Sequence, residues 1–220
     1  MPRILFYNHA EYALEYQRDC KMITKYDKTL NSILEANAGI ITSAEAQKAG
    51  ATRPAFSDFV RRHSLEKASR GVYLDPDFFP DEMALLQKRF PKVVFSHESA
   101  LYLHDLTDRE PMPISVTVDS SYNAGPLKAQ GARIYYTKPE WYVMGLAEVK
   151  TPTGAKVRTY DKERTICDLI RKRAAIDPAV FRQAIRGYAR SKDKDLARLS
   201  VYARAMSIES RVYEVMEVAL

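Results

Sequence analysis

Three charged residues in the middle of the chain have the types and order of a magnesium-dependent nuclease site. Asp119 ends the predicted strand 114–118, and Glu148 and Lys150 stand two residues apart further along the chain. Alternate residues of a strand share a face, so this pair and Asp119 could surround one metal ion. The carboxylates would hold magnesium and the lysine would orient a hydrolytic water. Glu-x-Lys triplets arise often by chance in a chain that is 28% charged, so a nuclease is the alternative function only.

Other catalytic motifs do not emerge from the sequence. It contains no glycine-rich phosphate loop and no His/Cys cluster with zinc-ligand spacing. His97 and His104 lie on one predicted helix, 96–104, without forming an HExxH pair. Ser96 and His97 are neighbours there, whereas a catalytic triad requires residues that converge in space. We therefore predict no catalytic residue, no metal and no cofactor, and expect that the protein is not an enzyme.

A basic segment from Lys48 to Arg70 has residue types suited to nucleic acid. Its cations and short hydroxyls can bind phosphate oxygens and base edges in a major groove. Asp58 is the exception: its carboxylate would accept from a cytosine amine, bond Arg61 or Arg62, or weaken nonspecific binding. The predicted DNA contacts are Lys48, Thr52, Arg53, Ser57, Arg61, Arg62, Lys67, Ser69 and Arg70.

The elements that would position this segment begin with two helices around a short extended pair. Apolar residues have helical spacing over 29–38, and the pair 40–41 follows. Thr42 and Glu45 match a capping box, which predicts a helix over 43–49.

The second half of the region predicts the basic helix and a hairpin. Thr52 caps a helix that runs to His63, with Pro54 in its first turn. The runs 65–68 and 72–74 flank a Ser-Arg-Gly turn and predict a β-hairpin. Helix, strand, helix, turn, helix and hairpin is the order of a winged helix-turn-helix.

We expect three parts in the chain. Residues 1–28 are an N-terminal extension of unknown role, and residues 29–77 are the winged helix-turn-helix DNA-binding domain. In residues 78–220, short helices and strands precede a helical C-terminus. The predicted fold class is therefore α+β: a winged helix, then a small mixed sheet with a C-terminal helical bundle.

A row of arginines marks one helix of the predicted bundle. Arg182, Arg186 and Arg190 fall at i, i+4 and i+8, which places them on one face as a candidate second basic surface. Three roles remain open for it: a longer DNA footprint, a contact with an acidic or RNA partner, or simple solvation.

Composition limits the partners and the location. The net charge is +6, and the basic excess lies in the two ends of the chain, which indicates a polyanionic partner. No apolar run is long enough to span a bilayer, and the start lacks a secretory apolar block. Cys20 and Cys167 form no CxxC pair and are predicted to be reduced thiols. We therefore expect a cytoplasmic protein without a membrane partner.

Two passages resemble one known family. The first is FSHESALYLHDLTDREPMPISVTVDSSYN, residues 95–123, which contains a Val-Thr-Val strand. The second joins VRTYDKERTICDLIRKRAAID, residues 157–177, to YARSKDKDLARLSVYA, residues 188–203. With the Arg-Gly-Val-Tyr turn of the hairpin, their order and spacing resemble the AbiEi family of abortive-infection antitoxins.

This resemblance implies a bacterial antitoxin of a type IV toxin–antitoxin system. Its winged helix would repress its own operon by binding operator DNA, as inverted repeats in the promoter. Its C-terminal domain would counteract a nucleotidyltransferase-like toxin without a stable direct complex. Such a system would protect a population against phage by halting the growth of infected cells.

Overall fold

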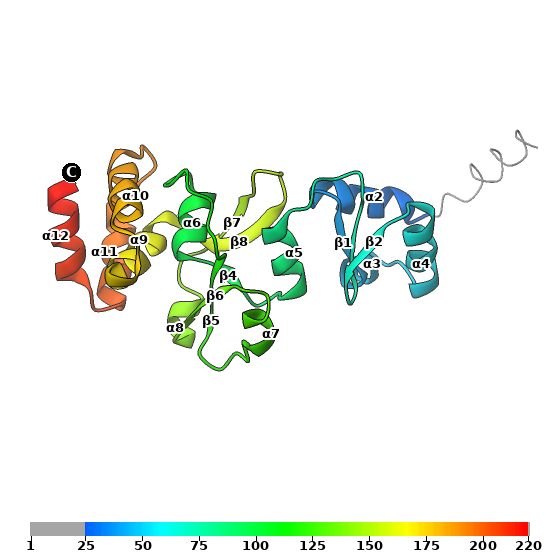
Figure 1. Cartoon of the computed structure of the whole chain (residues 1–220), viewed down its shortest axis with the longest axis horizontal. Helices are drawn as coiled ribbons and strands as arrows, with labels where there is room; N and C mark the ends of the chain where they lie inside the picture. The colour runs from blue at the N-terminus through cyan, green and yellow to red at the C-terminus, as the bar shows by residue number, and fades with distance from the viewer. Residues whose placement is uncertain (1–24, 220) are drawn as a thin grey trace, which may run out of the picture. The chain divides into compact units, whose positions relative to one another are not determined.

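The computed structural model describes residues 25–219, which divide into two compact units between Phe79 and Pro80. Each unit has its own sheet and its own helices, so the fold class is α+β (Figure 1). Most of the predicted N-terminal extension, with Cys20, lies outside the described residues. No helix within residues 25–219 has the length and apolar content needed to cross a membrane.

The first unit has its helices and strands in the order that the sequence predicts. Its small sheet has β3 in the centre, and both neighbouring strands run antiparallel to it. The elements are α2 (Asp27–Ala36), β1 (Ile40–Thr42), α3 (Ser43–Lys48), α4 (Arg53–Arg62), β2 (Glu66–Ser69) and β3 (Val72–Leu74).

Local hydrogen bonds set the ends of these helices. The predicted capping box is present: Thr42 Oγ1 accepts the Glu45 N–H at 3.1 Å, and Glu45 accepts the Thr42 N–H at 2.9 Å. Thr52 caps α4 by accepting the Ala55 N–H at 3.4 Å. Gly50 adopts a φ of +87°, a conformation that glycine reaches without strain, so the chain turns sharply between α3 and α4.

One apolar core holds the first unit together. Leu30 of α2, Ile41 of β1 and Phe59 of α4 are fully buried in it. Phe56 of α4 packs edge-on against Tyr73 of β3, with ring centroids 5.3 Å apart. Helix α4 is therefore fixed by one face, and its opposite face is left to solvent.

The second unit is built on a mixed sheet with strand order β6-β5-β4-β8-β7. Its strands are β4 (Val94–Phe95), β5 (Ser115–Asp119), β6 (Arg133–Thr137), β7 (Leu146–Lys150) and β8 (Lys156–Tyr160). Neighbours β5 and β6 run parallel, as do β4 and β8, whereas β4 with β5 and β7 with β8 run antiparallel.

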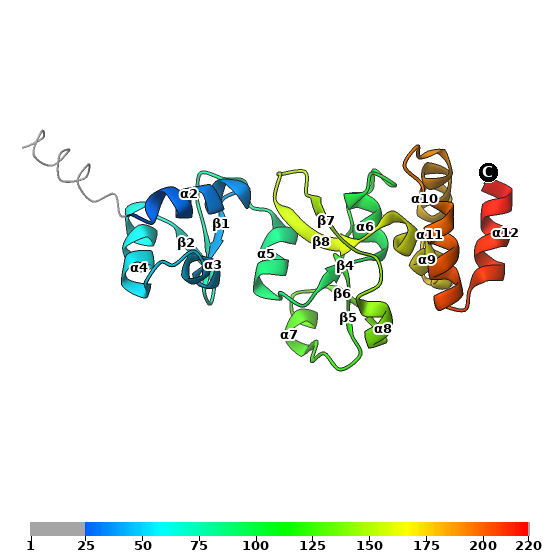
Figure 2. The same ribbon diagram turned by 180° about the vertical axis from the view of Figure 1, so that it is seen from behind.

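Helices surround this sheet and form a bundle at the C-terminal end of the chain. Helices α9 to α12 pack on one another around Ile166, Cys167 and Leu169, which are fully buried (Figure 2). Burial raises the pKa of the Cys167 thiol to about 12, so the thiol stays protonated. The helices are α5 (Glu82–Arg89), α6 (His97–Leu103), α7 (Gly125–Lys128), α8 (Pro139–Tyr142), α9 (Lys162–Arg171), the 3-10 turn η1 (Arg173–Ala175), α10 (Pro178–Arg190), α11 (Leu196–Ala205) and α12 (Glu209–Ala219).

Candidate nucleic-acid interface

The solvent face of α4 gathers several of the predicted DNA contacts. Arg53, Ser57 and Arg61 are exposed and lie four residues apart, on the side opposite the buried Phe56 and Phe59. Thr52 is exposed just before the helix begins. The arrangement follows from the helical period, because the apolar pair decides which face turns inward. One side of α4 is thus a row of cations and hydroxyls.

The hairpin and the end of α3 add further cations. Arg70 is exposed at the β2–β3 turn and Lys67 on β2, Ser69 is half-buried, and Lys48 is exposed at the end of α3. Gly71 has a φ of +74°, and a Cβ there would come within 2.8 Å of a Ser43 oxygen, so this tight turn requires glycine. Neither Lys67 nor Arg70 forms an ion pair with any residue in 25–219, which leaves both charges available to an anion.

Arg62 forms two ion pairs within the first unit. Its side chain is only 22% exposed, and it donates to both carboxylate oxygens of the buried Asp27, at 2.7 and 2.8 Å. Its Nε donates to Asp58 at 2.8 Å. Arg62 is therefore less exposed than the other predicted contacts of α4, and its guanidinium is occupied by two carboxylates. The buried Asp27 draws it inward, where it ties α4 to α2.

Asp58 takes one of the three roles considered for it. Its two oxygens accept from Arg61 at 2.6 Å and from Arg62 at 2.8 Å. These hydrogen bonds lower the pKa of the Asp58 carboxyl, so it stays ionised. Asp27 contributes to this arrangement and was not predicted, because nothing in the sequence signals a contact between residues so far apart.

The arginine row of the second unit lies exposed on α10. Arg182, Arg186 and Arg190 face solvent and line an open groove of about 400 Å³. Ala179, Gln183 and Gly187 line it with them. None of the three forms an ion pair within the part of the chain that the structure describes. The predicted common face is therefore present.

The three residues of the nuclease hypothesis do not form one site. Asp119 ends β5, whereas Glu148 and Lys150 are on β7, and β4 and β8 lie between these strands. Three strand spacings separate them, ~14 Å, which is too far for shared ligands of one ion. Asp119 instead accepts from the backbone N–H of Ser121 at 2.9 Å. Among the described residues, no group of three or more His, Cys, Asp or Glu side chains could hold a metal ion.

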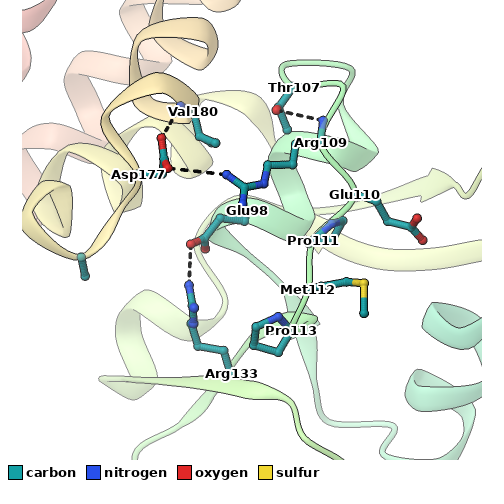
Figure 3. Close-up of a pocket in the computed structure, with 11 residues that line it drawn as sticks. Glu98, Thr107, Arg109, Glu110, Pro111, Met112, Pro113, Arg133, Asp177 and Val180 are labelled. Atoms are coloured by element: carbon teal, nitrogen blue, oxygen red, sulfur yellow. Dashed lines mark hydrogen bonds and ion pairs between the residues drawn. The ribbon is translucent and has the colours of Figure 1, made fainter.

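A small pocket of about 190 Å³ opens beside α6 and the start of α10 (Figure 3). Its charged walls pair with one another: Arg133 lies 2.7 Å from Glu98, and Arg109 lies 3.5 Å from Asp177. Each arginine already has a carboxylate, and Glu110 adds a third carboxylate to the lining, so the pocket offers no free cation to an anionic ligand. We assign it no ligand.

The predicted helix 96–104 is largely buried inside the second unit. His97 is 1% exposed, its Nδ1 lies 3.0 Å from Ser96 Oγ, and its ring stacks on Tyr135 with centroids 3.4 Å apart. Hydroxyls continue this network, since Thr117 donates to Ser96 at 2.8 Å. His104 bonds the Tyr160 carbonyl oxygen at 2.6 Å. Both histidines therefore serve packing and hydrogen bonding inside the second unit.

The buried His97 predicts a specific dependence of stability on pH. Burial lowers its pKa from 6.5 to about 4, so the unfolded chain takes up a proton that the folded protein refuses. This group's contribution to stability is complete above pH 6.5 and is lost as pH falls towards 4, a change of about 3 kcal/mol. Urea unfolding at steps across this range would measure it. Between pH 6.5 and pH 4, the unfolding free energy of His97→Gln should fall less than that of wild type. Equal falls would contradict the role assigned to His97.

Comparisons with known proteins found distant structural similarity and no matching family. No family model matches the chain, and no curated protein matches it. A crystal structure of the Rv2827c protein from Mycobacterium tuberculosis is similar with a TM-score of 0.46 and 12% identity, over 87% of this chain and 80% of that one. A likeness at that level carries no inference about function.

Proposed function

We propose that this protein is a DNA-binding transcriptional repressor whose residues 25–79 act as a winged helix-turn-helix. One observation carries the proposal: Arg53, Ser57 and Arg61 line the free face of α4, while Lys67 and Arg70 are exposed on the neighbouring hairpin. A helix of this kind fits a major groove, and the hairpin would meet the adjacent backbone. Cations on both elements would give affinity, and α4 would supply sequence preference.

We further propose that the repressor is the antitoxin of a type IV toxin–antitoxin system. The motifs at 95–123, 157–177 and 188–203 support this part, through their resemblance to AbiEi antitoxins. On this proposal the protein acts in the cytoplasm and represses its own operon. Its second unit counteracts a nucleotidyltransferase-like toxin without a stable complex between the two proteins.

Fluorescence anisotropy with two duplexes tests the DNA-binding proposal. One duplex is the sequence immediately upstream of the gene, and the other is a scrambled duplex of equal length. We expect tighter binding of the native duplex, with affinity that falls steeply as salt rises, because phosphate contacts release counterions. Equal binding of both duplexes would show that the basic face binds DNA only nonspecifically, and would overturn the proposal of a specific repressor. Failure to bind either would overturn the proposal.

The arginine row of α10 is proposed to bind DNA phosphates as a second basic surface. Reversing Arg182, Arg186 and Arg190 to glutamate should weaken binding of native and scrambled duplexes by the same factor, because phosphate contacts carry no sequence information. If all three meet phosphates, the salt slope should fall by about 3. The triple lysine variant keeps the charge and is the control. Unchanged binding in the glutamate variant would exclude DNA as the partner of this row.

A further inference from the structure

Four charged side chains of alternating sign form a continuous series of ion pairs, from the core of the first unit to its proposed DNA-binding face. Asp27 is 4% exposed at the start of α2, and it holds both terminal nitrogens of Arg62. Arg62 holds one oxygen of Asp58, and the other oxygen of Asp58 holds Arg61. Arg61 itself is 75% exposed. The buried end of this series of ion pairs is fixed, and its free end is Arg61, in the last turn of α4.

This connection distinguishes Arg61 from an ordinary surface ion pair. An exposed pair on a helix contributes little, because both side chains lose freedom when they meet. Here the carboxylate of Asp58 is already held by Arg62, whose paired hydrogen bonds to Asp27 have the bidentate geometry of a strong contact. Only Arg61 has to be ordered. Its guanidinium is therefore held in place before any ligand arrives.

The remaining donors of Arg61 are the ones that could read a base. A guanidinium has five N–H donors, and the hydrogen bond to Asp58 uses the Nη2 nitrogen of Arg61. Donors at Nη1 and the second hydrogen at Nη2 stay free for the two acceptors that guanine presents in the major groove. The Asp58 carboxylate beside these donors would also repel phosphate oxygens, which disfavours nonspecific binding to the DNA backbone.

We propose that Asp58 is a positioning and specificity residue, which holds Arg61 for recognition of a guanine and disfavours nonspecific DNA. Asp27 and Arg62 contribute indirectly, because Asp27 holds Arg62 and Arg62 holds Asp58. This inference rests on the proposed function, since it assigns roles within the same interface. It adds that removing a negative charge from α4 costs selectivity although it increases the attraction to DNA.

Anisotropy with the native and scrambled duplexes also tests this proposal. Asp58→Asn removes the charge and keeps the shape, and we expect it to bind the scrambled duplex more tightly while the native-to-scrambled ratio falls about tenfold. Arg62→Lys keeps the charge but cannot hold Asp27 and Asp58 together, so its ratio should also fall. Thermal unfolding of each variant would verify that the first unit remains folded.

Glu66→Gln is the matched control. Glu66 is an exposed acidic residue on β2 of the same unit and takes no part in this series of ion pairs. This variant should bind both duplexes more tightly by the same factor, which leaves the native-to-scrambled affinity ratio unchanged. A ratio in Asp58→Asn equal to that of Glu66→Gln would overturn the positioning role while the proposed function stands. A wild type that does not prefer the native duplex would overturn the proposed function, and this inference with it.

Discussion

Replacing Arg53, Arg61, Lys67 and Arg70 together by alanine is expected to weaken binding of the native duplex by at least ~100-fold. The four residues supply exposed cations on both α4 and the hairpin. Each phosphate contact contributes about 0.9 to the salt slope, so the slope should fall by about 3 if three of the four meet phosphates. The loss should exceed this electrostatic part for the native duplex, because Arg61 is expected to read a base. Anisotropy titrations at several salt concentrations would measure both quantities.

A matched variant separates this interface from a general effect of charge. Lys92, Lys128, Lys150 and Lys156 are exposed lysines of the second unit, and their replacement removes the same charge. We expect only a small change in affinity for either duplex from this control. If both quadruple variants lose affinity equally, the basic character of the whole chain, rather than α4 and the hairpin, would account for binding.

Asp168→Ala is expected to lower the free energy of unfolding by about 3–5 kcal/mol. Asp168 is 1% exposed and accepts from Nε of Arg164 at 3.0 Å. Arg164 is fully buried among Trp141, Met144 and the ring of Tyr160. Removing the carboxylate would leave a buried cation without its counterion. Urea unfolding followed by circular dichroism would measure the loss.

Two further variants make this second prediction specific. Asp193 pairs with Lys162 at 2.8 Å, but it is 69% exposed, so Asp193→Ala should lower stability far less than Asp168→Ala. The double variant Arg164→Met with Asp168→Leu replaces both charges by apolar groups and should recover much of the lost stability. An Asp168→Ala protein as stable as Asp193→Ala would show that Asp168 does not compensate a buried charge.

Several features of the first unit could be predicted because they depend on neighbours in the sequence. The Thr42–Glu45 capping box, the Thr52 cap and the Gly71 turn each arise within a few residues. The exposed row of α4 follows from the helical period, once Phe56 and Phe59 are assigned to the core. The same reasoning placed the arginines of α10 on one face.

Strand β7 was not predicted, although Glu148 and Lys150 had been considered as residues of a strand. Its alternation of exposed and half-buried residues is that of an edge strand, and it pairs only with β8. This segment is a strand because it pairs with β8, more than because of its own residue types. The sheet order likewise depends on pairings between distant segments, and it separates Asp119 from Glu148.

The sequence by itself determined where the helices begin, which faces they bury and where exposed cations gather, since caps, turns and periodicity act over a few residues. Only the tertiary structure decided which charges remain available to a partner. Arg61 and Arg62 are adjacent in the chain, yet Asp27 draws one inward while the other stays 75% exposed. The cause is an ion pair between α2 and α4, whose partners meet only after the two helices have packed.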